Sequence, residues 1–323
     1  MKILSISIPL LIAATVIFAG QPSIKKVFVV FSYHSEFSWV IDENKGITKG
    51  FAGNNIELEL FYMDTKRKTS PEWKQAITDK AIASITVFKP DVLMVFDDNA
   101  CEWVAKHYAG STLPVVFAGM NFEPAHYGFP TANITGVVEH IPLKAMIDLV
   151  TELDPTVRKV AFISDDSPTS SGIDERLPSL NLPVEILEVV ATNDFDEWKT
   201  KIMAWQDQVD AIGIFNYNTL KDAEGTVSMP PSNVMQWINE NNKLPEFASF
   251  DFAVKDGALC SAYKAGNTQG RVAAEIVLKI LTGTAPADLK ITDPPESVRI
   301  VNKARAKQLG IEMQKDADYR IIE

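Results

Sequence analysis

The chain has 323 residues, of which 46% are hydrophobic and 23% charged, and its formal net charge at pH 7 is −11. This composition is typical of a globular protein and allows two domains of ordinary size. A role in nucleic-acid binding is excluded, because affinity for a phosphate backbone comes from clustered Lys and Arg, and the run from Lys66 to Lys68 is too short.

Residues 1–20 predict a signal peptide, because Lys2 precedes an apolar run that extends to Phe18. We expect export, a mature chain that starts near Gly20 or Gln21, and a soluble protein in the periplasm. The preceding residues resemble a lipoprotein box, but Gln21 stands where the lipidated Cys would be. An uncleaved leader that acts as an anchor is the alternative, although the run is shorter than the ~20 residues that span a bilayer.

The first half of the chain alternates between strand and helix signals. Continuous apolar runs at residues 26–31, 91–96 and 114–118 predict strands that are buried on both faces. Before the second of these runs, Ser70 is expected to cap a helix that has Pro71 in its first turn. This order of elements predicts a parallel sheet with crossover helices.

A second α/β series begins after Gly136. We expect helices over residues 143–153, 195–205 and 232–241, and strands over residues 159–163, 211–215, 247–250 and 258–262. The last fifth of the chain adds a strand of small residues, an amphipathic helix that ends at glycine, and a further short strand and helix. These read GALCSAYKAGNTQGRVAAEIVLKILTG and then VRIVNKARAKQLGI.

This last stretch resembles the C-terminal segment of bacterial ABC-type periplasmic substrate-binding proteins, many of which have no assigned ligand. Three further stretches fit the same family: SYHSEFSW at residues 32–39, LPVVFAGMNFEP at 113–124, and the segment 133–172. The first of the three looks more like the sensor-type relatives. The resemblance therefore covers nearly the whole mature chain.

The resemblance implies the type I periplasmic-binding fold, in which two Rossmann-like α/β lobes with parallel sheets are joined by three hinge crossings. We expect crossings near residues 138, 266 and 293. The N-terminal lobe would then comprise residues 24–138 plus 266–292, and the C-terminal lobe residues 139–265 plus 293–323. Three hinge strands allow such lobes to close on a ligand, and we expect a monomer.

Ligands of parallel α/β folds bind at the carboxyl ends of the strands, where polar loops face a crevice. The loops expected there are rich in aromatic, amide and acidic side chains, which suits a small ligand held by stacking and directional hydrogen bonds. The candidate ligand-binding residues are Ser32, Tyr33, His34, Trp39, Asp97, Asp98, Asn121, Ser170, Ser171, Asn216, Asn218 and Asp251.

Several of these residues also fit structural roles. One of Asp97 and Asp98 suits a helix N-cap, and Ser170 and Ser171 suit either a helix cap or a carboxylate site. Trp39 suits either the closing of the cleft or the core face of the next helix.

Asp251 directly follows the strand expected over residues 247–250 of the second lobe, in the sequence ASFDF. In sugar- and amino-acid-binding proteins of this fold, an Asp at the matching place often bonds the ligand. The alternative is that Asp251 caps a turn toward Lys255 or pairs with Lys264 at the surface.

The resemblance implies a periplasmic solute-binding protein that closes on a small organic ligand and delivers it to an ABC permease. Amino acids, particularly aromatic ones, are the first candidates. The second hypothesis is a detached input protein for a sensor histidine kinase or a chemoreceptor.

A third hypothesis, a hydrolase, has little support, because the chain has no G-x-S-x-G elbow, Walker A loop or H-E-x-x-H pair. We therefore expect no enzymatic activity, no cofactor and no metal. The expected lobes separate Cys101 from Cys260, so both are predicted to be buried free thiols.

Overall fold

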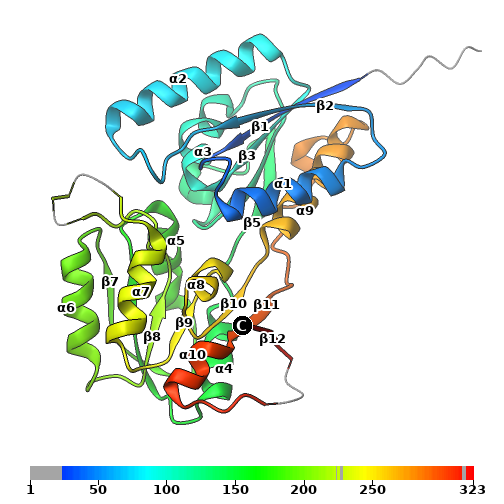
Figure 1. The fold of residues 1–323 in the computed structure, drawn as a ribbon. Coiled ribbons are helices and arrows are strands. Elements are labelled where there is room, and N and C mark those ends of the chain that lie inside the picture. Colours follow the sequence, from blue (N-terminus) through cyan, green and yellow to red (C-terminus); the bar gives the residue numbers. More distant parts are fainter. Residues whose placement is uncertain (1–23, 223, 226–227, 315–317) are drawn as a thin grey trace, which may run out of the picture.

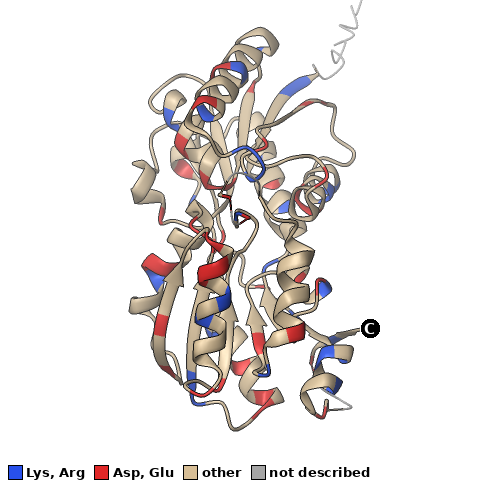
Figure 2. Ribbon diagram, turned by 60° about the vertical axis from the view of Figure 1, so that its left-hand side comes forward, with Lys and Arg blue, Asp and Glu red and all other residues tan. Residues whose placement is uncertain are grey.

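The computed structural model describes residues 24–222, 224–225, 228–314 and 318–323, and its described part forms two α/β lobes (Figure 1). The expected signal peptide over residues 1–20, and Gln21, lie outside the described residues. Among the residues that are described, no helix is both long enough and apolar enough to cross a membrane. Basic and acidic residues are interspersed along the ribbon of both lobes (Figure 2).

The sheet of the first lobe is parallel and has the strand order β2-β1-β3-β4-β5. Its strands are β1 (Lys25–Phe31), β2 (Ile56–Tyr62), β3 (Val92–Phe96), β4 (Val115–Met120) and β5 (Ile134–Val138). Every residue of β3, β4 and β5 is buried, and for β3 and β4 the continuous apolar runs predict this burial on both faces. The edge strand β2 alternates between exposed and partly buried residues along most of its length.

Helices cover both faces of this sheet. On one face, α1 (Ser38–Gly50) packs against α9 (Gly266–Leu281), which comes from near the end of the chain (Figure 1). On the other face lie α2 (Pro71–Phe88) and α3 (Asp97–Trp103). The side chain of Ser70 accepts a hydrogen bond from the backbone of Trp73, so the expected cap of α2 is confirmed.

Two glycines allow α1 and α9 to approach closely. A Cβ atom on Gly270 would lie 2.1 Å from the backbone oxygen of Glu43, and one on Gly46 would lie 2.1 Å from that of Asn267. Both obstacles are backbone atoms, so a methyl group fits only if one helix moves.

We therefore expect Gly270→Ala to lower the free energy of unfolding by ~1 to 3 kcal/mol, as measured by denaturant unfolding. In an unhindered helix the same change would stabilise by up to ~1 kcal/mol, because alanine is the better helix former. Lys279→Ala, at an exposed position of α9, serves as the control and should change stability by less than ~0.5 kcal/mol. A more stable Gly270→Ala variant would show that the helices separate without cost.

The second lobe has the strand order β12-β11-β10-β9-β8-β6-β7, in which β11 runs antiparallel to β10 and the other pairs are parallel. Its strands are β6 (Lys159–Ser164), β7 (Glu185–Ala191), β8 (Ala211–Ile214), β9 (Glu246–Ala248), β10 (Cys260–Tyr263), β11 (Val298–Asn302) and β12 (Arg320–Ile322). Its helices are α4 (Leu143–Leu153), α5 (Pro168–Arg176), α6 (Phe195–Trp205), α7 (Pro231–Asn241), α8 (Asp251–Lys255) and α10 (Lys303–Leu309). Helices α4, α5 and α10 contribute to the core on one face, and α6 and α7 to the core on the other.

Short 3-10 helices connect some of these elements. They are η1 (Ala105–Tyr108), η2 (Pro124–Tyr127), η3 (Leu177–Ser179) and η4 (Pro286–Asp288).

The described chain passes between the lobes after β5, between β10 and α9, and between η4 and β11 (Figure 1). These crossings lie side by side. His140 of the first and Lys264 of the second both contact Asp293 of the third, and the distance from His140 Nδ1 to Asp293 Oδ2 is 3.1 Å.

The predicted α/β class with two mostly parallel sheets is confirmed, as are the strands that the apolar runs indicated. Strands β2, β5, β7 and β12 were not predicted. β2 and β7 are exposed edge strands without a continuous apolar run, β5 is interrupted by Thr135 and Gly136, and β12 has three residues, of which two are exposed. Cys101 and Cys260 are buried free thiols, as expected.

Candidate functional site

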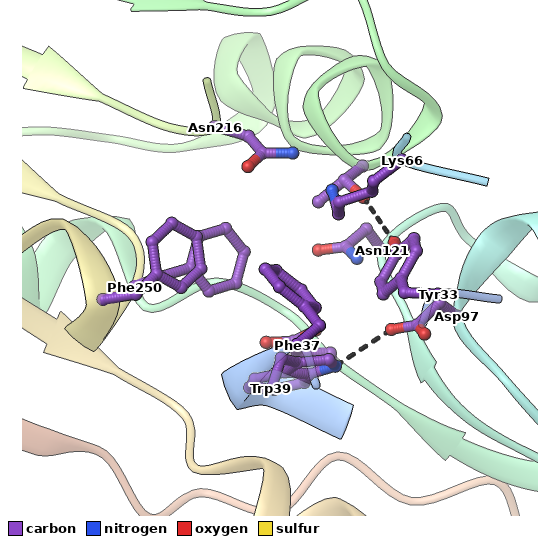
Figure 3. Close-up of a pocket in the computed structure, with 11 residues that line it drawn as sticks. Tyr33, Phe37, Trp39, Lys66, Asp97, Asn121, Asn216 and Phe250 are labelled. Carbon is purple, nitrogen blue, oxygen red and sulfur yellow. Dashed lines mark hydrogen bonds between the residues drawn. The ribbon is translucent and has the colours of Figure 1, made fainter. Parts of the chain in front are cut away.

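A small cavity lies between the lobes, at the carboxyl ends of strands from both sheets (Figure 3). The first lobe and the crossing after β5 line it with Tyr33, Phe37, Trp39, Lys66, Asp97, Asn121 and Glu139. The second lobe lines it with Thr169, Asn216, Phe250 and Phe252.

The lobes touch each other across this cavity. The Tyr33 hydroxyl lies 3.1 Å from Thr169 Oγ1, and the rings of Trp39 and Phe250 meet edge to face with their centroids 5.9 Å apart. Phe37 reaches into the space between Phe250 and Tyr33 (Figure 3). A volume of about 10 Å³ remains, so the structure represents a closed arrangement of the lobes.

Asp97 provides a buried acidic group at the first-lobe side of the cavity. It follows β3 directly and has a φ of 66°, a left-handed conformation that Asp and Asn tolerate better than most residues. The indole Nε1 of Trp39 donates a hydrogen bond of 3.0 Å to Asp97 Oδ1, whereas Oδ2 has no partner among the described residues. Burial raises the pKa of Asp97, and the adjacent carboxylate of Asp98 raises it further.

Glu139 adds a second buried carboxyl group, immediately after β5. Its side-chain atom Oε1 has no hydrogen-bond partner in the described part of the chain. Burial raises the pKa of Glu139, and the carboxylates of Asp97 and Asp98 raise it further. Glu43 of α1 is a third buried carboxyl group near Asp97 and Glu139. Burial raises the pKa of Glu43, and the carboxylates of Asp97 and Glu139 raise it further.

Asn121 directs its side-chain oxygen to the cavity because Asp98 holds the rest of the residue. Asp98 accepts hydrogen bonds from the backbone N–H of Asn121 at 3.1 Å, from Asn121 Nδ2 at 3.2 Å and from the Tyr127 hydroxyl at 2.9 Å. The amide nitrogen of Asn121 is thereby engaged, and Oδ1 is left without a partner among the residues described.

Lys66 is the cation of the cavity. Lys66 is 6% exposed, and its ammonium nitrogen lies 4.4 Å from the centroid of the Tyr33 ring and 5.7 Å from that of the Phe37 ring. Burial lowers the pKa of Lys66, and the surrounding carboxylates, Asp165 first, oppose that effect.

In the second lobe, Asp165 organises the start of α5. It accepts hydrogen bonds from Ser167 Oγ at 2.6 Å, Ser170 Oγ at 2.8 Å and the backbone N–H of Thr219 at 2.9 Å. These bonds fix the first turn of α5 and place Thr169 at the cavity.

The structure brings some of the candidate residues together at the cavity. These are Tyr33, Trp39, Asp97, Asn121 and Asn216.

Three other candidates lie one layer further out and hold the loops in place. Ser32 donates a hydrogen bond of 2.6 Å to the carbonyl of Phe96, Asp98 orients Asn121, and Ser170 bonds to Asp165. None of the three lines this cavity, and their side chains bond to backbone or side-chain groups of neighbouring segments instead.

The remaining candidates lie outside this cavity. His34 and Asn218 line a wider groove at its mouth, and Ser171 lines a separate groove between the lobes. Asp251 forms an ion pair with Lys255 at the next turn of α8, so the structure corrects the placement of Asp251 as the second-lobe contact. The reason is that α8 begins at Asp251 and turns its side chain away, while Phe250 and Phe252 face the cavity.

Six residues of the cavity are absent from the list of candidates, namely Phe37, Lys66, Glu139, Thr169, Phe250 and Phe252. A signal existed for some of them. Phe37 lies within the loop after the first strand, and Phe250 and Phe252 flank Asp251 in ASFDF. Lys66 follows the unpredicted strand β2, so nothing in the sequence placed it at a strand end.

Comparison with known proteins identifies relatives of this chain. The family model described as "ABC transporter substrate binding protein" matches residues 40–318. A protein named tyrosine-binding protein from Clostridioides difficile is 23% identical over 275 residues, which are 82% of this chain and 74% of that protein.

Solved structures show the same fold. An ABC domain from Streptococcus pneumoniae in complex with L-Trp has a TM-score of 0.72 and 18% identity, with 93% of this chain and all (100%) of that chain covered. A conserved domain protein from Vibrio cholerae has a TM-score of 0.72 and 19% identity, with 93% of this chain and 99% of that chain covered. The fold is therefore the type I periplasmic-binding fold, and the chain belongs to the family of ABC transporter substrate binding proteins.

Proposed function

We propose that this protein binds an amino acid with an aromatic side chain, outside the cytoplasmic membrane, and delivers it unchanged to an ABC permease. One observation carries the choice of ligand. Three side chains of the cavity each present an oxygen without a partner among the described residues, namely Asp97 Oδ2, Asn121 Oδ1 and Glu139 Oε1.

These acceptors suit an ammonium group. An ammonium group carries three N–H donors and no acceptor, so it complements a cavity whose lining side chains have three unpaired oxygens, two of them on carboxyl groups. A buried acceptor that remains unpaired destabilises the folded protein by ~1 to 3 kcal/mol. A hydrogen bond from a charged donor such as an ammonium group stabilises more than one from a neutral donor. A sugar hydroxyl would fit less well, because each hydroxyl donates one hydrogen bond and also needs a donor in return.

The remainder of the cavity is aromatic. Tyr33, Phe37, Trp39, Phe250 and Phe252 surround the polar groups, and the rings of Phe250 and Phe252 stack at 5.2 Å. Aromatic rings prefer offset-stacked or edge-to-face partners, and such walls suit a planar side chain on the ligand. The tyrosine-binding relative and the L-Trp complex support the same ligand class.

Export and delivery belong to this proposal. The apolar leader at residues 1–20 supports secretion, and the membership of the family supports a permease as the partner. The opposed lobes and their three crossings support closure around the ligand.

The proposal predicts that L-tyrosine, L-tryptophan or L-phenylalanine raises the melting temperature in a thermal-shift screen. A ligand at 100 times its dissociation constant stabilises the folded protein by ~2.7 kcal/mol. The matched control is 3-phenylpropanoate, which keeps the ring and the carboxylate of phenylalanine but lacks the ammonium group, and it should not stabilise. Stabilisation by sugars or nucleosides alone, or equal stabilisation by 3-phenylpropanoate, would contradict the proposal.

A further inference from the structure

Lys66 is held in position by the backbone of the loop after β2. The backbone N–H of Met63 donates to the carbonyl of Phe31 at 2.9 Å, and the N–H and hydroxyl of Thr65 donate to the carbonyl of Ser32 at 3.0 and 2.8 Å. These bonds fix the loop to the end of β1. The side chain of Lys66 therefore points into the cleft (Figure 3).

Lys66 differs from the two basic residues that follow it. Arg67 and Lys68 are about half exposed, and both pair with Asp64, at 2.6 and 3.8 Å. Lys66 is buried and makes no ion pair or hydrogen bond with any residue that the structure describes, and its close contacts are the faces of Tyr33 and Phe37. A buried ammonium without a carboxylate partner is costly, so its retention in the cavity calls for a reason.

The nearby carboxylates do not supply that partner. Asp165 is engaged by Ser167, Ser170 and Thr219, and Asp98 is engaged by Asn121 and Tyr127. Asp97 and Glu139 have unpaired oxygens, and neither forms an ion pair or a hydrogen bond with Lys66 among the described residues. The cavity thus presents unpaired acceptors and an unpaired cation as separate groups, which matches the two charged ends of an amino acid.

We propose that Lys66 binds the carboxylate of the ligand and thereby makes the site select amino acids over the corresponding amines. This inference rests on the proposed function and adds a residue that determines specificity. Thr169, whose hydroxyl lies 3.1 Å from Tyr33, and Asn216 line the same cavity and supply neutral donors beside the ammonium. A charged contact made in a buried site discriminates strongly, because an amine leaves the ammonium of Lys66 unpaired.

The test is isothermal calorimetry with two ligand pairs, L-tyrosine against tyramine and L-tryptophan against tryptamine. The unmodified protein should bind each amino acid more tightly than its amine. In Lys66→Met, affinity for the amino acids should fall by roughly 10- to 100-fold, whereas affinity for the amines should stay the same or rise. Lys68→Met, two residues away and exposed, is the control and should leave all four affinities unchanged.

Two outcomes would contradict the role of Lys66 and leave the proposed function unaffected. One is an amino-acid affinity of Lys66→Met within threefold of the unmodified protein. The other is an equal loss for amino acids and amines, which would mean that Lys66 only supports the cavity. If the unmodified protein binds neither member of either pair, the proposed function itself fails, and the inference with it. Lys66→Gln provides a second variant should Lys66→Met not fold.

Discussion

Asp97→Asn is expected to weaken binding of an aromatic amino acid by roughly 10- to 100-fold while leaving the protein at least as stable as before. The loss would follow because a neutral amide replaces one of the two carboxyl groups that, in the proposed function, bind the ammonium group of the ligand. The stability is retained because the change removes a buried acidic group whose Oδ2 has no partner among the described residues. Calorimetry and denaturant unfolding together measure the two effects.

This substitution disturbs little else. Asparagine tolerates the left-handed conformation at residue 97, and its side-chain oxygen can still accept the hydrogen bond from Trp39 Nε1. A variant that loses binding and stability together would show that Asp97 acts through the structure of the loop. A variant that binds normally would remove Asp97 from the ammonium site.

The same variant should change the pH dependence of stability. The folded protein raises the pKa of Asp97 above the ordinary value of 3.8, so the folded state keeps its proton at pH values at which the unfolded state has lost it. The stability that Asp97 contributes is therefore present at low pH and falls as the pH rises above ~4 through the raised pKa. Melting temperatures of Asp97→Asn should decline less steeply with pH, although Glu43 and Glu139 maintain part of the slope.

Arg305→Met is expected to lower the free energy of unfolding by ~3 to 5 kcal/mol, the largest change in stability that we predict. Arg305 of α10 is 3% exposed and forms an ion pair with Glu246 of β9, which is fully buried. Arg305 Nε donates to Glu246 Oε2 at 3.1 Å, and Nη2 donates to the carbonyl of Asn242 at 3.0 Å. Loss of Arg305 leaves the carboxylate of Glu246 buried with the amide of Asn242 as its remaining side-chain partner among the residues described.

Two variants separate this explanation from a simple loss of packing. The double variant Arg305→Met, Glu246→Leu should recover most of the stability, because it replaces the buried pair by apolar side chains. Arg299→Met removes the partner of Glu152 in a more exposed ion pair and should cost less than ~1 kcal/mol. Equal losses of stability in Arg305→Met and Arg299→Met would mean that burial of the ion pair does not increase the effect of removing one partner.

The interior of each sheet could be predicted from the sequence, and the edges could not. Strands such as β3 and β4 have buried residues throughout and read as continuous apolar runs. The edge strands β2 and β7 expose alternate side chains for most of their length and carry acidic residues, so they lack that signal. Because β2 was not predicted, Lys66 in the loop that follows it was not recognised as a site residue.

The direction of side chains within the loops could not be predicted either. Asp97 and Asp98 are neighbours after β3, yet Asp97 faces the cavity and Asp98 faces the backbone of Asn121 and Phe122. The positive φ of Asp97 and the hydrogen bonds from a distant loop decide between them. Asp251 and its flanking phenylalanines differ in the same way, because the start of α8 sets which of them turns outward.

The position of α9 in the chain has a consequence for biosynthesis. This helix covers one face of the first sheet and packs against α1, yet it begins at Gly266, after most of the second lobe. During translation the apolar face formed by Val27, Val29 and Ile47 stays without its cover until Ala273 and Val277 have left the ribosome. The N-terminal lobe therefore cannot complete its core until most of the second lobe has been synthesised, and its apolar face stays accessible to chaperones until then.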